Sequence, residues 1–182
     1  MILGGLMEFD YIVVGAGSAG CAVANRLSQC GNYNVALIEA GPDDNNPWIH
    51  VPVGYFRTMG NPKSDWRYET QPDKGIAGRS IPWPRGRVMG GSSSTNGLLY
   101  VRGQPQDFDI WSQLGCRGWS WEEVLPFFKR SENWDGIDET GLRGKDGPLS
   151  VQSSRLKRDI VDRWVDAAVT AGYQRNYDYN GS

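Results

Sequence analysis

The chain has 182 residues, of which 39% are hydrophobic and 22% are charged, and its formal net charge is −2 at pH 7. This length favours one domain with a hydrophobic core rather than two, and a weakly acidic balance argues against nucleic acid as a partner. No apolar run approaches the roughly 20 residues of a membrane-spanning helix, and the single histidine, His50, cannot build a histidine-rich metal site, so we predict neither a span nor a metal.

The beginning of the chain, residues 1–7, is apolar, but it lacks a basic region and is too short for a signal peptide. We interpret it as a leader. Three cysteines, Cys21, Cys30 and Cys116, show no paired spacing, which is typical of reduced thiols in a cytoplasmic protein. Residues 8–182 are expected to form the folded part.

The region 9–40 has the pattern of a strand, a helix and a second strand. An apolar run at about 10–14 predicts the first strand, an alanine-rich stretch at about 18–29 predicts the helix, and the run at about 34–38 predicts the second strand. This βαβ order is typical of an α/β fold with a parallel sheet.

A glycine motif joins the first strand to the helix. Gly15 permits the tight turn, Gly17 lets the backbone approach a pyrophosphate, and Gly20 lets the helix pack closely on the sheet. The helix that begins at Ser18 presents free N–H groups and the positive end of its dipole to an anion. Glu39 follows about 20 residues later, where a carboxylate accepts hydrogen bonds from an adenosine ribose and repels a 2′-phosphate. The motif therefore favours FAD or NAD over NADP.

Beyond residue 40 the regular alternation of strand and helix stops. Prolines and glycines punctuate the segment 41–84, which we interpret as an excursion from the sheet. Hydrophobic periodicity returns after it. We expect short strands at about 66–69 and 80–83, helices at about 105–114, 120–131 and 156–171, and the beginning of an edge strand at 147–151.

A second glycine-rich element spans residues 85–103. Its small residues at 90–94 let the main chain lie against a flat ligand, Arg87 adds positive charge, and Asn96 offers an amide that both donates and accepts. A flexible Gly/Ser linker would have polar low-complexity flanks, whereas here the apolar run 98–101 follows directly. A tight loop with a purely structural role stays open as an alternative.

With both glycine-rich elements present, the chain resembles the glucose-methanol-choline (GMC) family of FAD-dependent oxidoreductases. The resemblance covers about 9–179, and the family's first signature runs from 86 to 109. The choline-dehydrogenase-like branch is most similar, on the segments 64–66 and 107–111. The resemblance implies an α/β, Rossmann-like FAD-binding domain that is incomplete, because family members are a few times longer than this chain.

The signature departs from its usual aliphatic residues at Met89 and Thr95. In some relatives, the residue before the asparagine that matches Asn96 is a histidine bonded covalently to the flavin. Thr95 cannot form that bond, so the resemblance implies noncovalent FAD.

The resemblance also assigns cofactor contacts to positions of this sequence. It places the pyrophosphate on the first glycine turn, the adenosine ribose on the acid after the second strand, and the flavin half on the second glycine-rich element. The implied residues are Gly15, Gly17, Ser18, Ala19, Gly20, Glu39, Ala40, Arg87, Gly90, Gly91, Ser94, Asn96, Gly97 and Leu98.

The resemblance implies an enzyme that oxidises the CH–OH group of a small-molecule alcohol by hydride transfer to flavin. Its substrate domain and the His-His or His-Asn pair that takes the alcohol proton have no match here, and His50 matches neither catalytic position. We therefore predict no catalytic residue on this chain and interpret it as an N-terminal fragment that is inactive alone. The expected organisation is βαβ at 9–40, the excursion at 41–84, the flavin-loop signature at 85–109 and helical segments at 105–171.

Two other functions stay open. One is a fatty-acid photodecarboxylase of the same family, whose distinguishing residues would also lie outside this sequence. The other is an NAD-binding dehydrogenase or a noncatalytic dinucleotide-binding module. This second alternative explains Gly15 to Glu39 equally well, but it leaves the element at 85–96 without a purpose.

Overall fold

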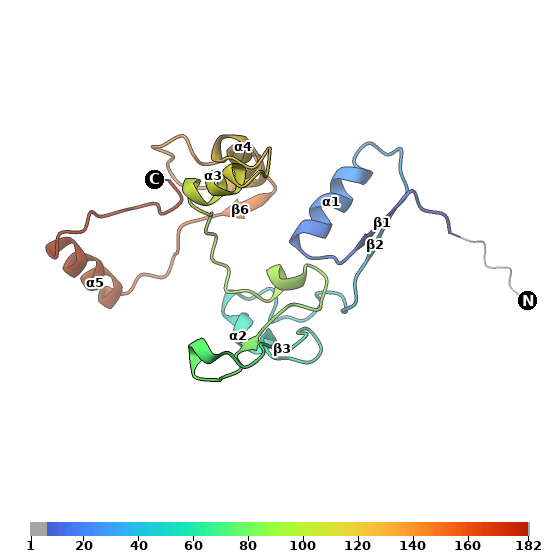
Figure 1. Cartoon of the computed structure of the whole chain (residues 1–182), viewed down its shortest axis with the longest axis horizontal. Helices are drawn as coiled ribbons and strands as arrows, with labels where there is room; N and C mark the ends of the chain where they lie inside the picture. The colour runs from blue at the N-terminus through green and yellow to red at the C-terminus, as the bar shows by residue number, and fades with distance from the viewer. Residues whose placement is uncertain (1–6, 182) are drawn as a thin grey trace, which may run out of the picture. The chain divides into compact units, whose positions relative to one another are not determined.

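The computed structural model describes residues 7–181. The chain divides into two compact units, Met1–Leu99 and Tyr100–Ser182, both drawn in Figure 1. The first unit contains the glycine-rich turns, and the second contains three of the longer helices. The leader predicted at 1–7 lies outside the described residues except for Met7, and a single domain over 8–182 stays a prediction.

The first unit begins with the predicted βαβ motif. Strands β1 (Tyr11–Val14) and β2 (Val35–Ile38) pair in parallel, with Tyr11 opposite Val35. Helix α1 (Ser18–Ser28) packs against both strands (Figure 1). It ends shortly before Gly31, whose φ of +71° takes the left-handed conformation that commonly follows a helix. The three predicted elements are confirmed to within one residue at each end.

The excursion at 41–84 consists of short elements. Strands β3 and β4 pair antiparallel, with Tyr68 opposite Trp83, and both are shorter than predicted. Two helical turns after Val51 were not predicted, although Pro52 is a residue type that favours a first helical position. The bounds are η1 Pro52–Gly54, α2 Tyr55–Thr58, β3 Tyr68–Glu69, η2 Lys74–Ile76, β4 Pro82–Trp83 and η3 Gly91–Ser94.

In the second unit, capping boxes begin the two predicted central helices. The carboxylate of Asp107 accepts from the backbone N–H of Gln104, and Glu123 does the same for Ser120. A short strand at 132–134, which was not predicted, pairs in parallel with the predicted strand near 150. The bounds are α3 Pro105–Gln113, α4 Trp121–Ser131, β5 Glu132–Trp134, β6 Leu149–Val151 and α5 Asp159–Thr170.

An aromatic cluster joins α3 to α4. Phe108 is buried, and its ring lies 5.5 Å from that of Trp111, 5.7 Å from that of Trp121 and 5.6 Å from that of Phe128, measured between centroids. Tilted and edge-on contacts of this kind stabilise aromatic pairs beyond the area that they bury. The cluster packs α3 against α4.

A buried charge cluster is the second feature of this unit. Glu132 has 0% of its surface exposed, and its Oε2 lies 2.6 Å from Nη2 of Arg102 while its Oε1 lies 3.0 Å from Nη2 of Arg143. The N–H of Gly144 donates to the same carboxylate, and Asp178 lies 3.6 Å from Nε of Arg143. A buried carboxylate is tolerated when it is paired and hydrogen-bonded in this way.

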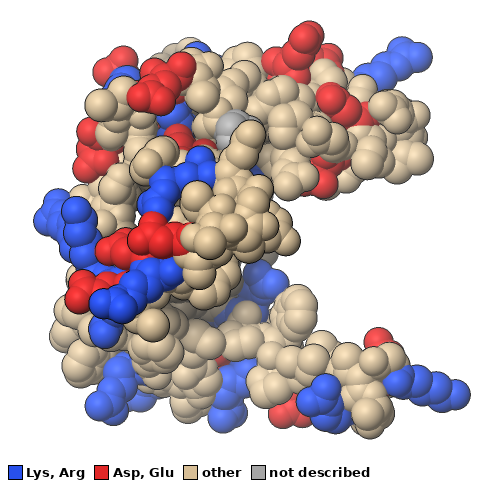
Figure 2. Space-filling view, turned by 90° about the vertical axis from the view of Figure 1, so that its left-hand side faces the viewer, with Lys and Arg blue, Asp and Glu red and all other residues tan. Residues whose placement is uncertain are grey.

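On the face shown in Figure 2, acidic and basic side chains are interspersed. Within residues 7–181, no helix combines the length and the apolar character that crossing a membrane requires.

Candidate dinucleotide-binding site

The first glycine turn connects β1 to α1. Gly15 has φ +94°, a conformation that L side chains rarely adopt, and its N–H donates to the carbonyl of Ile38 in β2 at 2.7 Å. A Cβ on Gly20 would overlap the carbonyl oxygen of Gly15, so only glycine allows α1 to start this close to the strand. Gly17 is the N-cap of α1, and no side chain caps the helix there. The predicted residues Ser18 and Gly20 therefore lie in an uncapped first turn.

Glu39 follows β2 directly and connects the second strand to this turn. Its Oε2 accepts from the N–H of Ala16 at 2.9 Å, and its Oε1 accepts from the N–H of Gly41 at 2.9 Å. The carboxylate thus binds the main chain of both loops: Ala16 after β1 and Gly41 after β2. Ala40 lies between Glu39 and Gly41 in the loop after β2. The sequence predicted a contact to ribose at Glu39, which stays a prediction, but it did not reveal this bridging role.

The second glycine turn contains η3. Gly90 has φ +89° and Gly91 has φ +58°, so both need the conformational freedom of glycine. The hydroxyl of Ser94 donates to the carbonyl of Met89 at 2.7 Å, and the hydroxyl of Ser93 donates to the carbonyl of Gly90 at 2.6 Å. The small residues of this segment therefore fold into a tight, internally bonded turn rather than a flexible linker.

The two glycine turns meet, although more than 70 residues separate them in the sequence. The N–H of Gly90 donates to the carbonyl of Ala16 at 2.8 Å. A Cβ on Gly91 would lie 2.8 Å from the Cα of Gly17, which is closer than real side chains come. The absence of a side chain at Gly91 therefore permits direct backbone contact between the two turns.

Neighbouring segments strengthen the same junction. The N–H of Met89 donates to the carbonyl of Pro42 at 2.9 Å, so the turn after β2 also holds the second glycine element. A Cβ on Gly41 would overlap the carbonyl of Arg87. Val88, between Arg87 and Met89 in the sequence, has 1% of its surface exposed and belongs to the core. Gly41 and Pro42 were predicted only as loop residues.

Arg87 lies next to Val88 at the contact between the two turns, and its side chain packs against residues of the segment 41–84. Its guanidinium carbon is 5.4 Å from the centroid of the Trp66 ring, and its Nη2 donates to the carbonyl of Pro62 at 3.1 Å. Its Nε is buried, and in the part of the chain that the structure describes this atom has no hydrogen-bond partner. Arg87 therefore brings one unsatisfied donor to the second element.

The residues after η3 continue the second element. Thr95 is buried, and Asn96 accepts from the N–H of Leu98 at 3.0 Å. Leu98 has φ +60°, a left-handed conformation that is unfavourable for a branched apolar residue and often occurs at functional sites. A Cβ on Gly97 would meet no atom within 4 Å, so this stretch is open on one side.

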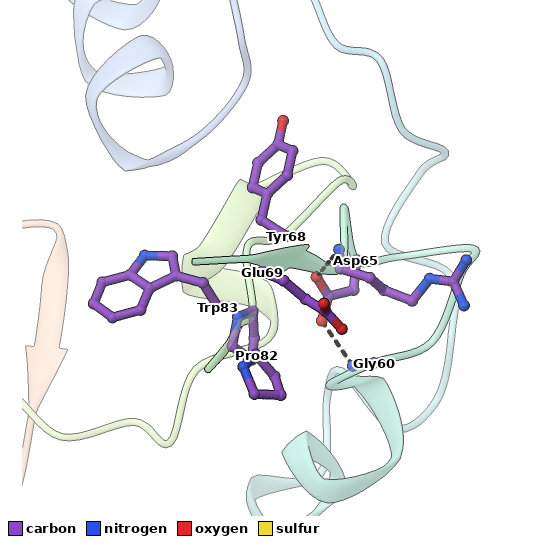
Figure 3. A pocket seen from close by; sticks show the side chains of 8 residues that line it. Gly60, Asp65, Tyr68, Glu69, Pro82 and Trp83 are labelled. Carbon is purple, nitrogen blue, oxygen red and sulfur yellow. Dashed lines mark hydrogen bonds between the residues drawn. The ribbon is translucent and has the colours of Figure 1, made fainter. Parts of the chain in front are cut away.

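Asp65 is a buried carboxylate that the site prediction did not include. It lies beside a cavity of about 200 Å³ at β3 and β4, where Figure 3 shows Tyr68 and Trp83 pointing in different directions. The N–H of Arg67 donates to the Asp65 carboxylate two residues earlier, which is an Asx turn. An aspartate in a loop favours this turn, and this is the local signal in the sequence that could have indicated the residue. The cavity is lined by Gly60, Asp65, Arg67, Tyr68, Glu69, Pro82, Trp83 and Pro84, and by none of the glycines of the two turns.

The geometry fits a ligand with a diphosphate and a flat ring system. An uncapped helix N-terminus with no acidic residue in its first turn suits a pyrophosphate, and a Cβ on Gly17 would meet no protein atom within 4 Å, so a ligand has room to approach. The second turn lies directly against this position, with Gly90 bonded to Ala16 and Gly91 against Gly17. The residues present therefore fit an extended dinucleotide that contacts both turns.

These features define the chain as a Rossmann-type dinucleotide-binding fold. The family model described as "GMC oxidoreductase" matches residues 9–182, and the chain belongs to that family. It is 46% identical over 175 residues to an oxygen-dependent choline dehydrogenase from Brucella anthropi, covering 96% of this chain and 32% of that protein. The corresponding protein of Vibrio vulnificus is also 46% identical, with 96% and 31% covered.

Solved structures agree with this assignment. Pyridoxine 4-oxidase from Mesorbium loti matches with a TM-score of 0.88 and 36% identity over 96% of this chain and 34% of that chain. Formate oxidase from Aspergillus oryzae, in a study of FAD modification, matches with a TM-score of 0.83 and 29% identity over 96% and 32%. The chain thus spans about a third of the length of these relatives. The predicted family, fold class and cofactor type are confirmed.

Proposed function

We propose that this chain forms the FAD-binding part of an oxidoreductase that acts on the CH–OH group of an alcohol. The observation that carries the proposal is the contact between the two glycine turns, in which Gly90 donates to Ala16 and Gly91 lies against Gly17. A simple NAD-binding βαβ unit would need only the first turn. The second turn gives the site a surface for the other half of a longer dinucleotide.

In this proposal each half of FAD has its own residues. The N-terminus of α1, from Gly17 to Gly20, holds the pyrophosphate through backbone N–H groups and the helix dipole. Glu39, already fixed by two N–H donors, directs its remaining lone pairs to the ribose hydroxyls. The flavin half lies along 90–98, and Thr95 leaves the cofactor noncovalently bound.

FAD, when bound, supplies the ring that accepts a hydride from the alcohol carbon. The chain's own residues bind and orient it, and they contribute no proton acceptor for the alcohol. The only histidine of the sequence, His50, is exposed and lies 2.7 Å from the carbonyl of Asp44 through its Nε2. We therefore propose that the 182-residue chain binds FAD but does not oxidise alcohols by itself.

A ligand titration tests the proposal. The purified chain is titrated with FAD, FMN, NAD and NADP while flavin or tryptophan fluorescence is recorded. We expect FAD to bind most tightly, because it alone presents both an adenosine diphosphate and a flavin to the two turns. Selective binding of NAD would support the dehydrogenase alternative instead, and flavin that stays attached after acid denaturation would contradict noncovalent binding.

A further inference from the structure

Asp65 accepts three backbone hydrogen bonds from residues that are not adjacent to it. Its Oδ2 accepts from the N–H of Gly60 at 2.7 Å, and its Oδ1 accepts from the N–H of Arg67 at 2.8 Å and of Arg85 at 3.0 Å. Figure 3 shows the contact to Gly60. Only 4% of the residue surface is exposed, so water cannot readily replace these bonds.

The bond to Arg85 is part of a longer pairing. The N–H of Trp66 donates to the carbonyl of Arg85 at 2.9 Å, and the N–H of Arg87 donates to the carbonyl of Ser64 at 2.8 Å. The segment around Asp65 therefore lies antiparallel to the beginning of the second glycine element. Two main-chain hydrogen bonds and the Asp65 carboxylate therefore hold the beginning of the second glycine element, although Arg85 lies 20 residues after Asp65 in the sequence.

The same element leads directly to the second glycine turn. The N–H of Gly86 donates to the hydroxyl of Ser92 at 3.1 Å, and the N–H of Gly90 donates to Ala16. A shift at 85–87 is thus passed on to the turn through a few short bonds. We propose that Asp65 is a positioning residue, which sets where the flavin-side turn lies relative to the phosphate-side turn.

A left-handed residue next to the carboxylate supports this role. Arg67 has φ +53°, which is unfavourable for a residue with a side chain. Its N–H is one of the two that donate to Oδ1 of Asp65, so the carboxylate holds the chain in this conformation. An unfavourable backbone conformation persists only where surrounding contacts hold it, and such residues cluster at functional sites.

The inference rests on the proposed function. Binding of ADP and of FAD distinguishes a failure of the positioning role from a failure of the proposed function. ADP contacts only the phosphate-side turn, whereas FAD needs both turns. In Asp65→Asn the amide cannot accept at both of its ends, so the bonds to Gly60 and to Arg85 cannot all persist. Asp73→Asn is the matched control, because Asp73 also accepts a backbone N–H in the excursion, from Gly75 at 2.7 Å, but does not contact 85–87.

Binding constants for FAD and ADP are measured for the wild type and both variants. We expect Asp65→Asn to weaken FAD about tenfold while the ADP affinity changes less than about twofold, and Asp73→Asn to change neither. The double variant Asp65→Asn, Arg67→Gly relieves the strain at Arg67 and keeps the test valid if the single variant does not fold. The double variant should still bind FAD more weakly than the wild type while its ADP affinity is unchanged.

An equal loss of both ligands, or unchanged FAD affinity in both Asp65 variants, would overturn the positioning role. A wild-type chain that binds ADP but not FAD would overturn the proposed function, and the positioning role would fall with it. Circular dichroism at the assay temperature establishes that each variant is folded before its binding is compared.

Discussion

Gly91 faces Gly17 so closely that a Cβ on Gly91 would lie 2.8 Å from the Cα of Gly17. The contact joins the turn after β1 to a turn more than 70 residues further along the chain. Because Gly91 has no side chain, the backbones of the two turns lie directly against each other, and we propose that one ligand contacts both. The predictions below follow from that contact and from the carboxylates that hold the chain around it.

Gly17 and Gly20 differ in what a side chain would meet. In Gly17→Ala the new Cβ meets no protein atom within 4 Å, so we expect little change in melting temperature but a loss of FAD affinity of about tenfold or more. In Gly20→Ala the Cβ overlaps the carbonyl of Gly15, which should lower the free energy of unfolding by about 1–3 kcal/mol. Thermal melting and FAD titration of both variants separate the two effects. Equal melting temperatures for the two variants would contradict the close approach at Gly20.

Glu39→Gln tests whether the Glu39 carboxylate holds together the loop after β1 and the loop after β2. The amide can accept from only one of the N–H groups of Ala16 and Gly41, and Ala16 is fully buried. We expect the free energy of unfolding to fall by about 1–3 kcal/mol and FAD to bind more weakly. Urea denaturation measures the first effect. The exposed Glu69→Gln serves as control, and a similar result for both variants would count against the bridge.

Removal of the charge at Glu132 should destabilise the second unit strongly. Glu132→Gln leaves Arg102 buried without the carboxylate that pairs with it and leaves Arg143 with the more distant Asp178, at a cost of about 3–5 kcal/mol in the free energy of unfolding. The exposed Glu139→Gln should stay within about 0.5 kcal/mol of the wild type. Urea titrations followed by tryptophan fluorescence make the comparison. A small effect at Glu132 would mean that the cluster relaxes or admits water.

Asp65 makes stability depend on pH. Burial by itself raises the pKa of Asp65, but the N–H donors of Arg85, Arg67 and Gly60 outweigh burial and hold the pKa below its ordinary value of 3.8. The folded state therefore binds a proton less readily than the unfolded state, so this stabilisation is present above about pH 4 and is lost as pH falls through the lowered pKa.

The comparison with Asp65→Asn isolates this contribution. The wild type should be more stable than the variant at pH 7, and the difference should shrink as pH is lowered below about 4, because the variant has no carboxyl to protonate. Urea titrations from pH 7 to pH 3 measure the difference. A gap that stays constant over this range would show that folding does not lower the pKa of Asp65.

The sequence predicted the βαβ motif and the longer helices well, because their signals are local. The apolar runs, the glycine spacing and the capping residues at Gln104 and Ser120 all act within one or two turns of chain. The three-residue strand β5 was missed because three residues carry too little periodic signal. Convergence of the two glycine turns was expected from the family resemblance, and the bond from Gly90 to Ala16 agrees with it.

The carboxylates were harder to predict. Asp65 accepts from Arg85, and Glu132 pairs with Arg102, over separations that leave no local pattern. In sequence both acids look like ordinary surface residues, since burial of a charge depends on partners that only the fold brings near. Glu39 was identified for its position after β2, but its bonds to the two N–H groups depend on how the turns close.

Hydrogen–deuterium exchange with and without FAD tests the central claim most directly, because it reports on both turns in one experiment. The account predicts that FAD slows exchange at 15–20 and at 90–98 together, while the amides of α5 (159–170) stay unchanged. Protection at the first turn alone, or no protection at either, would show that the two turns do not hold one FAD molecule.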